Sequence, residues 1–89
     1  MTAQARAVNV TGSATVFAGP CTFRGCALFS TAGATVTIYD NTAASGTVLA
    51  KFTLPAGGDK DIDLADGVRC DVGVRIETSA AVEGHVRIG

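Results

Sequence analysis

The densest run of side chains able to do chemistry is the acidic stretch 59–66, whose carboxylates are Asp59, Asp61, Asp63 and Asp66. Hard cations such as Ca²⁺ bind several converging carboxylate oxygens, and the stretch begins like a calcium loop. Its sixth position is Leu64 instead of glycine, however, and its twelfth is Cys70 instead of glutamate. On an extended strand the carboxylates would form the solvated face opposite Ile62 and Leu64. We favour the solvated face and predict no metal site, although cation binding stays an open alternative.

The other candidate ligands are three cysteines and the single histidine, which are Cys21, Cys26, Cys70 and His85. A structural zinc site needs four converging ligands, but Cys21 and Cys26 would point to opposite faces of one strand. The same strand would separate their Cα atoms by ~16 Å, beyond the ~7 Å limit of a disulfide. We therefore predict three reduced thiols, Cys70 as a small core residue, and no cofactor.

Catalysis would have to depend on His85, which lies beside Glu83 and Arg87 on the polar side of an alternating segment. A solvated position is the ordinary interpretation of such a residue. The chain contains no nucleophile elbow, no phosphate-binding glycine loop and no dinucleotide fingerprint. We predict that the protein is not an enzyme.

Composition limits the classes of protein that could hold these residues. The 89 residues are 47% apolar with a net charge of −1, which excludes intrinsic disorder and argues against a nucleic-acid binder. No apolar run approaches the ~18 residues of a membrane span, and no secretory leader is recognisable. We expect one domain over residues 1–89, made in the cytoplasm and not secreted.

Alternation of apolar and polar residues is clearest near the C-terminus. Between Val68 and Glu77, and again between Val82 and Ile88, the even-numbered positions are apolar. This is the pattern of half-buried antiparallel strands, and the intervening Thr78–Ala81 predicts a hairpin. A two-residue loop would pair even-numbered positions of one strand with odd-numbered positions of the other. The hairpin therefore needs a loop with an odd number of residues, or a bulge. Otherwise the two strands must lie in different sheets.

Weaker alternation predicts further strands at residues 8–10, 14–18, 21–30, 34–40, 47–54 and 59–64. Eight strands at this spacing are typical of an all-β fold, and we predict a small antiparallel β-sandwich, jelly-roll-like, with about eight short strands. We expect a hairpin turn at 31–33 and crossings between sheets at 41–46 and 55–60. Within the strand at 21–30, the pattern predicts one shared face for Cys21, Phe23, Ala27 and Phe29.

Charge is scarce over residues 7–50, where only Arg24 and Asp40 are charged. Soluble surfaces normally carry about 25–35% charged residues, so a surface this poor in charge predicts contact with neighbouring chains. We expect self-contact through the uncharged residues Tyr39, Thr37 and Leu49. Rim contacts are expected from the basic residues Arg75, His85 and Arg87. The alternative for Arg69, Arg75 and Arg87 is simple cross-strand charge pairing with Asp71, Glu77 and Glu83.

The stretch Ile38–Leu49, followed by Leu-Pro-Ala-Gly-Gly at 54–58 and Asp-Gly-Val-Arg-Cys at 66–70, resembles small virion proteins of tailed bacteriophages with a β-sandwich fold. The resemblance covers about half the chain as a pattern of turns and strands. It implies a structural virion protein, most simply a capsid decoration or cement subunit, or else a part of a tail or head fibre. It also implies a homo-oligomer, trimer or dimer, bound to a major capsid or other virion protein, with no nucleic acid or membrane as partner.

A function of another class stays open beside this one. A small β-sandwich can be a ligand- or carbohydrate-binding module, which requires a groove with exposed aromatic rings. In the predicted fold only Tyr39 is well placed for that function, because the four phenylalanines are expected in the core.

Overall fold

The structure, a computed structural model, describes residues 6–89 as eight strands joined by short turns. The strands are β1 (Arg6–Val10), β2 (Ala14–Ala18), β3 (Cys21–Ser30), β4 (Ala34–Asp40), β5 (Thr47–Leu54), β6 (Gly58–Cys70), β7 (Gly73–Thr78) and β8 (Glu83–Ile88). The all-β prediction and the number of strands are confirmed. In the part of the chain that the structure describes, no helix has the length and hydropathy that a membrane crossing needs.

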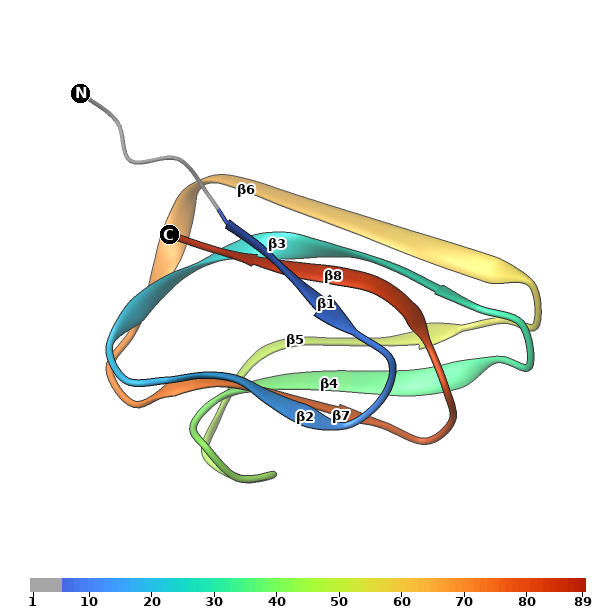
Figure 1. The fold of residues 1–89 in the computed structure, drawn as a ribbon, viewed down its shortest axis with the longest axis horizontal. Helices are drawn as coiled ribbons and strands as arrows, with labels where there is room; N and C mark the ends of the chain where they lie inside the picture. The colour runs from blue at the N-terminus through green and yellow to red at the C-terminus, as the bar shows by residue number, and fades with distance from the viewer. Residues whose placement is uncertain (1–5) are drawn as a thin grey trace.

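The strands form two antiparallel sheets of four, which lie face to face as the upper and lower layers of Figure 1. Sheet A has the order β1-β8-β3-β6, and sheet B has the order β2-β7-β4-β5. The chain pairs like one long hairpin, β4 with β5, β3 with β6, β2 with β7 and β1 with β8. Successive segments of this ribbon fall alternately into the two sheets, which is the jelly-roll arrangement that the spacing predicted.

The connections differ from the sequence-based expectation in two places. Residues 41–46 form a hairpin between β4 and β5 within sheet B, so the predicted crossing there is wrong. Residues 31–33 cross from sheet A to sheet B, so the predicted hairpin there is also wrong. The crossing after Leu54 is confirmed, because β5 and β6 belong to different sheets. The strands β7 and β8 also lie in different sheets, which resolves the parity conflict of the expected C-terminal hairpin.

The segment 58–78 shows how one pattern of alternation can continue across two sheets. The predicted strand 68–77 is divided, because β6 ends at Cys70 in sheet A and β7 begins at Gly73 in sheet B. Cys70 and Val74 are both buried, since the inner faces of the two sheets look at the same core. Val72, which the pattern placed inside, lies in the crossing and is 48% exposed.

Two irregularities in sheet A change which residues face outward. The pairing of Phe23 with Val68 is followed by Gly25 with Asp63, so β6 carries extra residues at 64–67, between the two strands that the sequence predicted at 59–64 and 68–77. On β3 the inward side changes at Gly25, whose φ is +126°. Phe23 is fully buried before this point, whereas Phe29 beyond it is 36% exposed. The expected inward positions of Ala27 and Phe29 are therefore wrong, because a bulge shifts the alternation by one residue.

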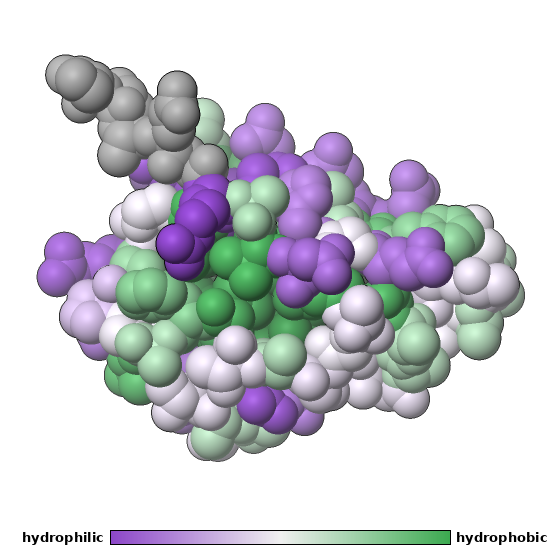
Figure 2. All heavy atoms as spheres, in the orientation of Figure 1, coloured by the Kyte–Doolittle hydropathy of each residue, from purple (hydrophilic) through white to green (hydrophobic). Residues whose placement is uncertain are grey.

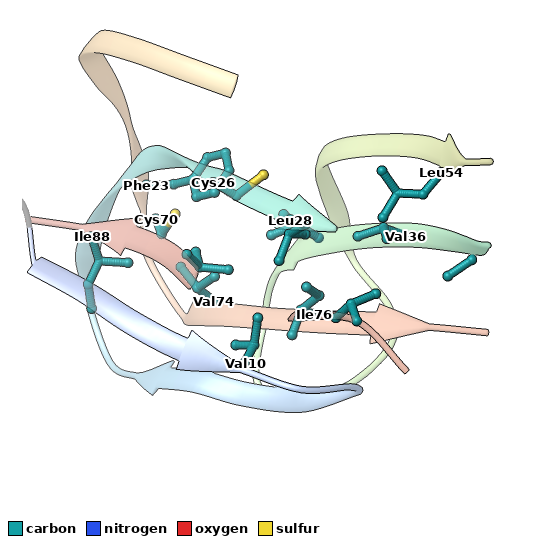
Figure 3. Close-up of a cluster of buried hydrophobic side chains, with 14 residues drawn as sticks. Val10, Phe23, Cys26, Leu28, Val36, Leu54, Cys70, Val74, Ile76 and Ile88 are labelled. Atoms are coloured by element: carbon teal, nitrogen blue, oxygen red, sulfur yellow. The ribbon is translucent and has the colours of Figure 1, made fainter. Parts of the chain in front are cut away.

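The core lies between the sheets and is made almost entirely of aliphatic side chains, Phe23 and two cysteines (Figure 3). Both sheets contribute, with Phe23 and Val86 from sheet A meeting Ile38 and Ile76 from sheet B. Within the described residues, the one buried polar side chain is Ser30. Its hydroxyl donates to the Ala81 carbonyl (3.0 Å) and accepts from the Gly33 amide (3.1 Å). These bonds satisfy a buried polar group and join two crossings between the sheets.

Candidate interaction surfaces

The outer face of sheet B, here called the threonine face, is formed by Thr15, Thr35, Thr37, Tyr39, Val48, Lys51, Thr53, Arg75 and Glu77. These residues are direct neighbours across the strands. Arg75 on the central strand β7 stands between Thr15 of β2 and Tyr39 of β4. Thr37 stands between Glu77 and Lys51. The arrangement gives a surface on which four of the nine side chains are threonines.

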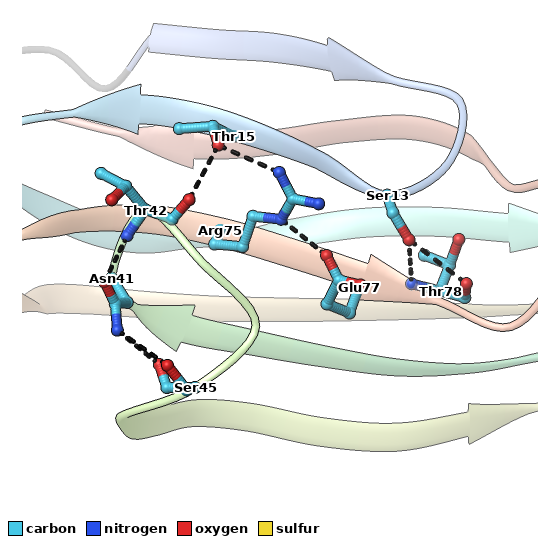
Figure 4. Close-up of polar contacts among 8 residues, drawn as sticks. All are labelled: Ser13, Thr15, Asn41, Thr42, Ser45, Arg75, Glu77 and Thr78. Atoms are coloured by element: carbon cyan, nitrogen blue, oxygen red, sulfur yellow. Dashed lines mark hydrogen bonds and ion pairs between the residues drawn. The ribbon is translucent and has the colours of Figure 1, made fainter.

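The central charges of the threonine face are neutralised within it. Arg75 Nε donates to Glu77 Oε2 at 2.6 Å, and Arg75 Nη1 donates to Thr15 Oγ1 at 3.1 Å (Figure 4). Thr15 Oγ1 in turn donates to the Thr42 carbonyl (3.3 Å), so the 41–46 hairpin loop is attached to β2. Asn41 closes that loop by donating to the Ser45 carbonyl at 2.8 Å. Only Lys51 on this face has no ion-pair partner among the described residues.

A bulge in sheet B decides which apolar residue the threonine face exposes. Ile38 pairs with Ala50 and Tyr39 with Val48, so Leu49 is the extra residue of the bulge. Leu49 is half-buried and packs against the core, and its predicted outward position is wrong. Val48, which alternation placed inside, is 50% exposed beside Tyr39. Sequence reasoning missed Val48 because a strand pattern carries no mark of a bulge that lacks a glycine.

The outer face of sheet A, here called the charged face, has the opposite chemistry. It presents Ala27, Phe29, Asp59, Asp61, Asp63, Glu83, His85 and Arg87. In Figure 2, purple hydrophilic side chains concentrate over this upper layer, whereas the lower layer is mainly white and pale green. The four aspartates of the 59–66 stretch are exposed, as the solvated-face interpretation predicted. Among residues 6–89, no three His, Cys, Asp or Glu side chains are grouped closely enough to hold a metal ion.

Arg87 organises the centre of the charged face. It lies across β3 where Gly25 has no side chain, and it donates to the Ile62 carbonyl (2.6 Å) and to Asp61 Oδ1 (3.2 Å). Its Nη1 also donates to His85 Nε2 at 3.0 Å, because an arginine has no acceptor. A side chain at Gly25 would place its Cβ only 1.9 Å from the Ile62 carbonyl oxygen. The glycine therefore makes this three-strand contact possible.

A shallow groove of about 490 Å³ runs beside this contact, over β8, β3 and β6. Its lining includes the small residues Ala27 and Gly84 and the exposed ring of Phe29. Phe29 pairs across the strands with Asp59 on one side and Glu83 on the other. Neither carboxylate forms an ion pair within the described residues. Phe29 is thus the exposed aromatic that the sequence alone assigned to the core.

The predicted interface residues do not share one surface. Tyr39, Thr37 and Arg75 lie on the threonine face, whereas His85 and Arg87 lie on the charged face of the other sheet. Arg75 is hence separated from the two rim residues with which the sequence grouped it. The expected cross-strand pairing of the arginines holds for Arg87 alone, and its partner is Asp61. Arg69 and Arg75 pair with residues two positions along their own segments, Asp71 and Glu77.

Asp40 joins the two sheets at one end of the molecule. Its carboxylate accepts from the backbone amides of Val72 (3.0 Å), Asp71 (3.2 Å) and Gly73 (3.3 Å). These donors favour the charged form and hold the pKa of Asp40 below its usual value. The side chain therefore stabilises the crossing from β6 to β7, which otherwise leaves its amides without partners.

The cysteines are free thiols, as predicted, and they lie on the inner side of sheet A, whereas His85 is on its outer face. The four candidate zinc ligands accordingly do not converge. Burial raises the pKa of Cys26 and of Cys70 to about 11 in each case. Cys21 and Cys70 are direct neighbours across β3 and β6, a pairing that the sequence analysis did not consider.

Comparisons of the chain with protein-family models, with curated proteins and with solved structures gave no match.

Proposed function

We propose that this protein is a structural subunit that works by packing its threonine face against further copies of itself. The observation that carries the proposal is the separation of chemistry between the two sheets. Of the 15 charged residues, ten lie on strands of sheet A and four on strands of sheet B. Two of those four, Arg75 and Glu77, neutralise each other. Interface centres are depleted in unpaired charge, and the centre of the threonine face has that property, because Lys51 lies on the edge strand β5.

The size of the face supports assembly in many copies. The molecule measures 39 × 27 × 17 Å, and its sheets are stacked along the intermediate direction in Figure 1. A face of 39 × 17 Å corresponds to about 660 Å², somewhat less than the ~800 Å² that each partner buries in a standard interface. One such contact would bind weakly. In a lattice each copy makes several contacts, and once one has formed the others form at a high effective concentration, so the overall affinity rises.

The virion is the setting that we propose for this assembly. The resemblance to phage virion proteins favours a capsid decoration or cement subunit, bound to a major capsid or other virion protein. The jelly roll agrees with this at the level of fold, since viral capsid domains use it, although lectins use it as well. Tyr39, Thr37, Arg75 and Val48 are the proposed self-contact residues. His85 and Arg87, on the opposite face, are available for a different partner.

The test of self-contact uses charge placed on one face at a time. The variant T35K/T53E puts a lysine and a glutamate on two exposed, directly opposed threonines, and the two charges pair within the chain, so the fold should tolerate them. Their long, hydrated side chains stand above the short threonines around them and should keep a second copy from packing closely against the face. D59K/E83K is the matched control on the charged face. Light scattering from micromolar to millimolar concentration should show association for the native chain and for D59K/E83K, and a monomer for T35K/T53E. Association that survives T35K/T53E, or a native chain that is monomeric throughout, would contradict the proposal.

The virion setting has its own test. Mass spectrometry of purified particles should detect the polypeptide at a fixed ratio to the major capsid protein. If infected cells contain the chain but purified particles lack it, the virion setting is wrong, whatever the result for self-contact.

The groove on the charged face favours a second candidate function, carbohydrate binding. A sugar ring could stack on Phe29 while its hydroxyls bond to the unpaired carboxylates of Asp59 and Glu83. This candidate predicts glycan-array binding that F29A abolishes and that Y39A, on the opposite face, leaves intact. A glycan array with no signal above background would contradict carbohydrate binding.

A further inference from the structure

Two of the three thiols face each other inside the sandwich. Cys21 is the first residue of β3 and Cys70 is the last residue of β6, and the two are direct partners in the ladder. Directly opposed residues of a ladder project to the same side of the sheet, so the two side chains are neighbours. Residues directly opposed in an antiparallel pair have Cα atoms about 4.5–5.5 Å apart. A disulfide accepts Cα separations of about 4.4–6.8 Å, so the backbone is already spaced for one.

Access to the pair is one-sided. Cys70 is completely buried, but Cys21 is partly exposed. Cys21 lines a pocket of about 260 Å³ together with Phe17, Pro20 and Ile88. A small reagent that enters this pocket reaches Cys21, whereas Cys70 is not among the residues that line it. Cys26, by contrast, is fully buried and stands opposite Ile62, so it has no thiol partner across the β3–β6 ladder.

We propose that Cys21 and Cys70 form a disulfide when the protein meets a small-molecule disulfide of the glutathione class. The Cys21 thiolate attacks one sulfur of the reagent, forms a mixed disulfide and releases one thiol of the reagent. The Cys70 thiolate then attacks the Cys21 sulfur, forms the Cys21–Cys70 bond and releases the second thiol. Two electrons pass from the protein to the reagent, and the two cysteine protons end on the released thiols.

The bond would lie next to the interruption in the β3–β6 ladder of sheet A. Between Phe23–Val68 and Gly25–Asp63 the ladder of β3 and β6 is interrupted by the extra residues of the bulge. Cys21–Cys70 closes the ladder on the far side of that interruption, directly before the chain crosses to sheet B. The cross-link would therefore hold the C-terminal end of edge strand β6 in place and constrain a long loop of the unfolded chain. This inference is independent of the proposed function.

The experiment incubates the reduced full-length chain with oxidised glutathione and follows intact mass, peptide maps and Tm. We expect the mass to fall by two hydrogen atoms, a peptide linked through Cys21 and Cys70, and a Tm increase of about 10 °C or more, which reducing agent reverses. C26A is the matched control and should behave like the native chain. C70S should stop at a glutathione adduct on Cys21, because the resolving thiol is absent.

Three results would overturn the proposal. They are a native chain that stays fully reduced or stops at a glutathione adduct, a covalent dimer linked through Cys21, and an internal bond that includes Cys26. The peptide map of the native chain decides among these outcomes without any variant, so a misfolded C70S would not affect the conclusion.

Discussion

The two sheets share one core but have acquired different outer faces. Sheet B carries six threonines on its strands, namely Thr15, Thr35, Thr37, Thr47, Thr53 and Thr78, whereas sheet A carries one, Thr22. Sheet A carries most of the charge and the groove around Phe29. Both inner faces line the same core, so both must present apolar side chains that pack without voids. The outer faces do not line the core, so their composition is free to differ.

Irregularity is also distributed differently. In sheet A the break at Gly25 and the extra residues of β6 bring Phe29 outward and let Arg87 cross to β6. In sheet B the bulge at Leu49 moves Val48 outward, and a second shift of register lies between Thr15 and Phe17, where β2 pairs with β7. Bulges of this kind re-aim side chains. The two outer faces of one sandwich thus differ in shape as well as in charge, and the shallow groove lies over sheet A.

The largest expected effect is at the glycine that makes the charged face possible. G25A forces a positive φ on alanine and a Cβ clash with the Ile62 carbonyl, so we expect loss of at least about 4 kcal/mol or failure to fold. Denaturant unfolding measures this. G12A, at a glycine with ordinary φ and free space, should cost less than about 1 kcal/mol. Equal losses for the two variants would mean that the bulge at Gly25 does not shape sheet A.

The second largest effect is expected on β3, where the side of the strand that faces the core changes at Gly25. F23A removes a fully buried ring and should destabilise the fold by about 3–5 kcal/mol. F29A, on the same strand with the same change, should cost less than about 1 kcal/mol because the ring is partly exposed. The reverse order in thermal or denaturant unfolding would show that Phe29 packs in the core, as simple alternation suggests.

The third effect compares the central arginine of each face. Arg87 donates to a carbonyl and a carboxylate on β6 and to an imidazole on its own strand, and R87M should cost about 1–3 kcal/mol. Arg75 pairs mainly along its own strand, and R75M should cost about 0.5–1 kcal/mol. If R75M proves the more costly variant, the threonine face is held by its ion pair rather than by backbone pairing.

The smallest effect concerns Asp40, whose carboxylate accepts hydrogen bonds from the crossing between β6 and β7. The folded pKa of Asp40 is lowered by backbone donors, so its stabilisation is present above the unfolded pKa and is lost as pH falls through the folded value. D40N should therefore lower Tm modestly at neutral pH. The Tm curves of D40N and the native chain should converge in acid. Curves that stay parallel down to the acid limit would show that the carboxylate charge does not hold the crossing.

Much of the inner surface was predictable from alternation alone. Val36 and Ile38, and likewise Val82, Val86 and Ile88, are buried as their even spacing predicted. Prediction failed at Phe29 and Leu49, where a bulge shifts the alternation, and at Val72, where the chain leaves one sheet for the other. The candidate surfaces were only partly predictable, because an outward position does not say which sheet the residue belongs to.

The sequence by itself determined that this chain forms eight short strands around an aliphatic core. The alternation of apolar and polar residues with a period of two indicates which side chains are buried. Only the tertiary structure decided that Arg75 and Arg87 lie on opposite faces and that Cys21 meets Cys70. Those facts depend on which strands pair and on where bulges fall. Pairing is set by contacts between distant segments, and local alternation carries no information about them.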